Sequence, residues 1–151
     1  MAASTTLKGT EYTKTAAIVA GTEGGGGTFP DASKRKVRAM YDEFTSGTAY
    51  DAGSIISMGL LPKGCRVLGF LVSWEAQGAA VTMDLTIGGV AASTAEAVTD
   101  MTSAGSLFIP ALETFQGTPL TADSIVALVT AAQSTGIDDS VSLTTLYVDE
   151  D

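Results

Sequence analysis

The sequence predicts an all-β domain, an antiparallel β-sandwich preceded by a flexible N-terminal arm. Short segments that alternate apolar and polar residues recur along residues 34–151, and turn residues interrupt them at spacings typical of sandwiches and barrels. No long segment has the spacing of an amphipathic helix. The 151 residues are 45% hydrophobic and 17% charged, which suits one domain with a core of its own.

Residues 1–33 are expected to form the arm. They are rich in Thr, Ala and Gly, with one apolar stretch, Ala16–Ala20, in which Ile18 and Val19 are candidates for pairing with a neighbouring subunit's sheet edge. Four consecutive glycines then predict a hinge, because glycine has the largest backbone freedom. The hinge residues are Gly24, Gly25, Gly26 and Gly27. Their spacing does not match a phosphate-binding loop.

We call residues 34–151 the body, and its first half is predicted to form four strands and a turn. Lys34–Thr45 alternates with both residue sets partly apolar, and Ser54–Met58 is a second, short strand. Leu61–Gly64 is a predicted tight turn, since Pro fixes one torsion and Gly permits positive φ. Cys65–Trp74 is a near-continuous apolar run typical of a buried strand. Val81–Ile87 alternates strictly and predicts a strand buried on one face.

The second half of the body is less regular. Ala92–Ala97 is predicted as a short helix, because its serine is followed three residues later by a glutamate, as in a capping box. Ser106–Ile109 and Leu112–Phe115 are expected to form one strand broken at the proline between them. In Ser124–Thr130 helix and strand compete, and the β-branched residues favour a strand. Val141–Val148 alternates and predicts the last strand.

Composition argues against an enzyme. The chain has no His, which excludes Ser-His-Asp triads, Cys–His dyads and His-ligated zinc. One cysteine cannot form an intramolecular disulfide. The adjacent acids Asp42 and Glu43 are expected to point to opposite faces of a strand, and the pair Asp138 and Asp139 lacks calcium-loop spacing. We therefore expect no catalytic residues, metal, cofactor or small-molecule substrate.

Four single residues have a structural interpretation beside a functional one. Cys65 is expected to be a small, half-buried residue, although the neighbouring Arg66 could lower its thiol pKa. Tyr41 and Phe70 are expected in the core. Trp74, at the end of a strand, is expected to cover the core rather than to form a binding platform.

Charge is unevenly distributed along the chain. The first 66 residues hold all eight basic and six acidic residues, for a net charge of +2, and the remainder holds eleven acids and no base. An acidic body argues against nucleic acid as a partner. The cationic residues of two short segments are candidate contacts with an acidic protein surface: Lys34, Arg35, Lys36, Arg38, Lys63 and Arg66. Simple solvation is the alternative interpretation.

Membrane and secretion signals are missing from the sequence. No apolar run approaches the 18 or more residues of a membrane span, and the N-terminus has no apolar signal region. We therefore expect a soluble chain made in a reducing cytoplasm and no membrane partner.

Several motifs carry a resemblance to a known family. Val37–Asp42 is followed by a segment with Leu61-Pro62-Lys63-Gly64 and Arg66-Val67-Leu68, and then by Leu85-Thr86-Ile87-Gly88-Gly89. This arrangement resembles a family of tailed-bacteriophage virion proteins, over about two thirds of the chain from Val37 onward. The closing strand Leu143–Val148 is similar too, and Cys65 stands where the family usually has Ala.

The resemblance implies a jelly-roll-like sandwich with a structural role. The implied function is to decorate and stabilise a phage capsid, as a cement protein that binds the major capsid protein lattice in the virion after synthesis in the host cytoplasm. A body rich in Gly and Ala, with 7% aromatic residues, has a modest core, so we expect subunit contacts to add stability. With the resemblance, this predicts a homotrimer.

Two alternatives remain open. One is a phage tail or neck protein of similar fold. The other is a β-sandwich module that binds a carbohydrate or another ligand, which an aromatic platform on the surface would favour; a single Trp argues against it.

Overall fold

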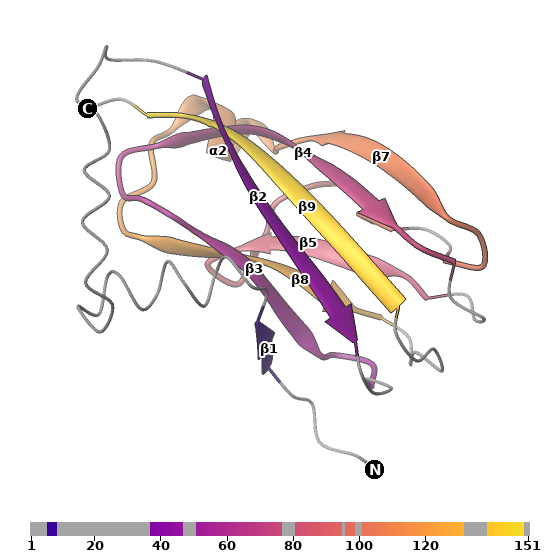
Figure 1. Cartoon of the computed structure of the whole chain (residues 1–151). Helices are drawn as coiled ribbons and strands as arrows, with labels where there is room; N and C mark the ends of the chain where they lie inside the picture. The colour runs from indigo at the N-terminus through magenta and orange to yellow at the C-terminus, as the bar shows by residue number, and fades with distance from the viewer. Residues whose placement is uncertain are drawn as a thin grey trace, which may run out of the picture.

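The computed structural model confirms the all-β class and shows two sheets packed face to face (Figure 1). It describes residues 6–8, 37–46, 51–76, 81–94, 96–98, 101–131 and 139–149. One sheet has the strand order β2 (Val37–Ser46), β9 (Asp139–Val148), β4 (Arg66–Trp74), β7 (Gly105–Pro110). The other has the order β1 (Thr6–Lys8), β3 (Ile55–Leu61), β8 (Ser124–Thr130), β5 (Met83–Ile87), β6 (Val90–Ala91).

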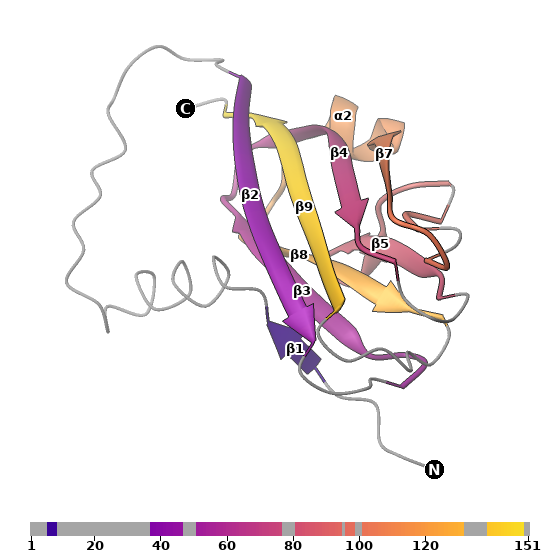
Figure 2. The same cartoon turned by 45° about the vertical axis from the view of Figure 1, so that its right-hand side comes forward.

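The strand order is that of a jelly roll. From β2 to β9 every pair of neighbouring strands is antiparallel. The chain changes sheet at each connection except the β5–β6 hairpin, where Gly88 and Gly89 both have positive φ. The result is two four-stranded sheets facing each other, as two interlocked Greek keys produce (Figure 2). The strand β1 is an addition to this plan and lies parallel to β3.

Strand β9 organises the four-stranded sheet. It pairs with β2 over ten residues and with β4 over eight. Its alternate side chains Val141, Leu143 and Thr145 are at most 2% exposed and point between the sheets. They join a core drawn from both sheets, whose largest fully buried members are Phe70, Ile56, Met58, Leu61, Met83, Leu85, Met101, Leu128, Leu143, Val67 and Val72. Burial of each large apolar side chain contributes about 1.5–3 kcal/mol.

The predicted turn at Leu61–Gly64 is confirmed and connects β3 to β4. Gly64 has φ 89°, and the Cys65 N–H donates to the Pro62 carbonyl over 3.4 Å. The turn carries the chain from β3 into β4 of the opposite sheet, rather than between neighbours in one sheet. It is held by the loop before β8, because Leu120 accepts from the Gly64 N–H and donates to the Cys65 carbonyl.

Two sequence-based predictions were wrong in the second half of the body. The described part of Ala92–Ala97 contains no helix; the N–H groups of Ala97 and Val98 donate to the Met83 carbonyl, which ties this segment to β5. Ala97 and Val98 are fully buried, and this burial together with the bonds to β5 outweighed the capping pattern. Residues after Pro110 form a short helix, α2 (Glu113–Gly117), instead of strand, because the Leu112 carbonyl accepts from two following N–H groups.

Gly69 gives a test of this packing. A Cβ at Gly69 would lie 2.7 Å from Phe108 Cζ and 2.9 Å from the Ile109 carbonyl oxygen. Because a backbone atom must move, we expect Gly69→Ala to lower the free energy of unfolding by about 1–3 kcal/mol, measured by urea denaturation. Gly117→Ala is the matched control, since a Cβ there meets nothing within 4 Å. Equal stability of the two variants would contradict this packing.

Candidate partner-binding surface

The outer face of the four-stranded sheet holds exposed apolar side chains in register. Tyr41 on β2 pairs with Thr144 on β9, Thr144 with Leu71 on β4, and Leu71 with Phe108 on β7. Residues directly opposite each other share a face, so these four form one row across the sheet. The exposed fractions are 52% for Tyr41, 42% for Leu71 and 54% for Phe108.

A second uncharged row lies beside the first. It consists of Ala39, Leu146, Gly69 and Pro110. None of the eight residues in the two rows is charged, in a chain of net charge −9. Exposed apolar patches of this kind mark interaction surfaces. We call these two rows the apolar face.

One aromatic side chain of the apolar face is held in place. The ring of Phe108 occupies the space that a Cβ at Gly69 would need. A sheet position without a side chain thus supports the exposed ring, which gives the apolar face a preformed shape. A ring that is already held in place loses little rotamer entropy on binding, which favours affinity.

The expectation that Tyr41 lies in the core was wrong. Asp42 is fully buried, which directs Tyr41 and Glu43 outward, and the Tyr41 hydroxyl donates to Glu43 Oε2 over 3.1 Å. Partial burial raises the Tyr41 pKa, and Glu43 raises it further. The prediction that Asp42 and Glu43 point to opposite faces is confirmed. Sequence reasoning missed Tyr41, Leu71 and Phe108 as surface residues, although apolar residues in both alternating sets signal a sheet that is apolar on both faces.

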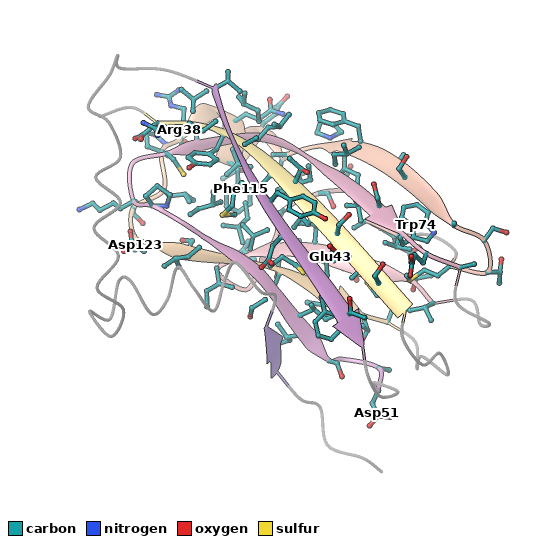
Figure 3. All side chains as sticks on the ribbon, in the orientation of Figure 1. Arg38, Glu43, Asp51, Trp74, Phe115 and Asp123 are labelled. Atoms are coloured by element: carbon teal, nitrogen blue, oxygen red, sulfur yellow. The ribbon has the colours of Figure 1, made fainter. Side chains whose placement is uncertain are left out.

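The cationic candidates in the described chain gather at one end of the sandwich. Val37 pairs with Val148, and Val148 with Arg66, so β2 and β4 begin where β9 ends. Arg38 and Arg66 therefore lie at the same end, and Lys63 is in the adjoining turn. Figure 3 shows Arg38 at this end and Asp51 at the other.

Acidic residues already engage part of this cationic end. Arg38 Nη2 lies 3.3 Å from Asp149 Oδ2, and both side chains are partly exposed. The backbone N–H of Lys63 donates to Asp123 Oδ1 over 2.8 Å. Contacts of Arg38, Lys63 and Arg66 with a partner stay predictions. The remaining candidates lie outside the described residues: Ile18, Val19, Gly24, Gly25, Gly26, Gly27, Lys34, Arg35 and Lys36.

Cys65 differs from its expectation. Its side chain is fully buried rather than half-buried, and burial raises the thiol pKa to about 12, with Asp149 and Asp123 raising it as well. Arg66 therefore does not produce a reactive thiolate. Trp74 covers the core edge as expected: it packs against the core cluster and its Nε1 donates to the Ser103 carbonyl over 2.9 Å (Figure 3).

Neither a metal-binding cluster nor a membrane-spanning helix is found among the described residues. Among the described residues, no group of three or more Cys, Asp or Glu side chains is placed to hold a metal ion. In the same part of the chain, no helix is long and apolar enough to cross a membrane.

Comparison with known proteins identifies the fold. No protein-family model and no curated sequence matches the chain. A chain in the capsid of Ralstonia phage GP4 is similar in structure, with a TM-score of 0.61 and 19% identity, over 80% of this chain and 88% of that one. A chain in the cyanophage Pam1 capsid asymmetric unit gives a TM-score of 0.57 and 18% identity, over 78% and 88%. The jelly-roll sandwich is thus a fold found in phage capsids.

The buried thiol makes stability depend on pH. Between about pH 9 and 12 the folded chain keeps the Cys65 proton and the unfolded chain releases it, so the free energy of unfolding falls as pH rises. We expect Cys65→Ala to flatten this decline, measured by urea denaturation across the range.

We also expect native Cys65 to resist alkylation at pH 8, because its side chain is buried. Alkylation at the rate of the unfolded chain would contradict this burial.

Proposed function

We propose that the chain is a non-enzymatic structural protein of a phage virion, which binds the major capsid protein lattice and stabilises it. The observation that carries the proposal is the uncharged apolar face on a fold shared with chains of two phage capsids. The face is built from strand register rather than from mobile loops, so it is suited to repeated, identical contacts. Apolar burial there supplies the affinity, and the cationic end orients docking on an acidic surface.

Self-association belongs to the same proposal. We infer a homo-oligomer, with a trimer as the expected state, because a symmetric assembly multiplies the weak contacts of a small protein. A tail or neck location is the alternative, and the number of copies in each particle separates the two.

A carbohydrate-binding module is the second candidate, favoured by one observation. Tyr41 and Phe108 are both more than half exposed and lie in one row of the sheet. Aromatic rings on a flat face are suited to stack on sugar rings. The nearest polar row on the same face consists of Glu43, Ser142, Ser73 and Ser106.

Removal of the aromatic rings tests the apolar face. We expect Tyr41→Ser with Phe108→Ser to weaken binding to virus particles assembled without this chain by at least about tenfold, because exposed aromatic anchors dominate interface energies. Occupancy is measured by cosedimentation. The control is Val90→Ser, since Val90 is 62% exposed on the other sheet. Unchanged particle binding by the double variant would mean that the apolar face does not contact the capsid. Retention of the unmodified chain on glycan arrays would support the carbohydrate-binding module instead.

A charge reversal tests the cationic segment that precedes β2. We expect Lys34→Glu with Lys36→Glu to weaken particle binding several-fold and to reduce its dependence on salt, because exposed charge pairs contribute about 0.2–1 kcal/mol each. Binding is measured across a sodium chloride series. The same occupancy and salt slope as in the unmodified chain would mean that these lysines are only solvated.

A further inference from the structure

The N-terminal strand β1 occupies the free edge of the five-stranded sheet. Thr6, Leu7 and Lys8 pair in parallel with Ile55, Ile56 and Ser57 of β3, whose other edge pairs with β8. This ladder is only three residues long. Among the described residues, none pairs with the same edge of β3 beyond Ser57.

The connection from β1 to the body is long and rich in glycine. Residues 9–36 separate β1 from β2, and six of these 28 residues are Gly. A chain of 28 residues has a fully extended reach of about 90–100 Å. A domain of this size has a radius of gyration of only about 13 Å. The connection is therefore long enough to reach β3 of an adjacent copy as well as β3 of its own chain.

Charge favours the adjacent copy. Residues 1–36 hold five basic and three acidic residues, a net charge of +2, whereas residues 37–151 hold three basic and 14 acidic residues, a net charge of −11. Two bodies brought together repel each other. An exchanged β1 brings Lys8 of one chain to the acidic body of the next, which offsets part of that repulsion.

We propose that β1 is exchanged between copies, so that Thr6–Lys8 of each subunit pairs with β3 of a neighbouring subunit. The ladder and register stay those of the single chain, so exchange loses no contact. In a closed ring each subunit donates one β1 strand and receives one, so an N-terminal segment crosses every subunit interface. This inference rests on the self-association in the proposed function and is independent of capsid binding.

Disulfide trapping distinguishes exchange from pairing within one chain. The variant carries Thr6→Cys and Ile55→Cys, which are register partners, with Cys65→Ala to remove the native thiol. After mild oxidation, denaturing electrophoresis without reductant separates the products. Exchange predicts that most linked material is interchain, as dimers and larger species. Linked material that runs as single chains overturns the proposal, as does the absence of any disulfide.

A matched control measures random collisions. Thr6→Cys with Leu60→Cys, also in the Cys65→Ala chain, places the second thiol on the same strand outside the β1 register. Exchange predicts at least about fivefold less interchain product from this pair; equal yields overturn the proposal.

A truncation supplies a measurement without introduced cysteines. Removal of residues 1–8 is expected to weaken self-association at least tenfold by sedimentation, while the circular dichroism spectrum of the body is retained. Unchanged self-association overturns the proposal. Particle binding by the unmodified chain is measured in parallel: a chain that exchanges β1 without binding particles retains this inference and contradicts the proposed function.

Discussion

The two-residue period of β2, β9 and β4 is the constraint on which the rest of the structure depends. Alternate residues of β9 fill the space between the sheets, and its ten-residue and eight-residue ladders fix which residues of β2 and β4 join them. A shift of one residue would bring Tyr41 and Leu71 into the core and expel Asp42 and Val72. The inward-facing and the outward-facing residues of these strands are both apolar in part. The register that builds the core therefore also builds the apolar face.

The two surfaces that the proposals use lie on different sheets. The apolar face belongs to the four-stranded sheet, whereas the edge that β1 occupies belongs to the other sheet. Under the two proposals, a subunit contacts a lattice through one sheet and its own copies along the edge of the other, without competition. The cationic end, where Arg38 and Arg66 lie, is a third feature, and in the proposed function it orients docking more than it adds affinity. The buried, protonated Cys65 adds packing rather than chemistry.

The sequence predicted the fold class because strand periodicity and turn residues are local signals. The turn at Leu61–Gly64 is an example, although its path between sheets depends on a distant partner, Leu120. The segment after Pro110 was misassigned because a helix of one turn leaves no periodic pattern. Tyr41 was misassigned because the burial of Asp42 decides on which face of the sheet the Tyr41 side chain lies. The pairing of β1 with β3 joins residues nearly fifty positions apart, which no local pattern reveals.

The copy number of this chain in purified virus particles tests the central claim most directly. Quantitative mass spectrometry against labelled standard peptides gives its ratio to the major capsid protein. A decoration protein that binds each equivalent site of the lattice predicts a fixed, simple ratio and hundreds of copies in a large capsid. A few copies in each particle would place the chain in a tail or neck, and its absence from particles would contradict a virion role altogether.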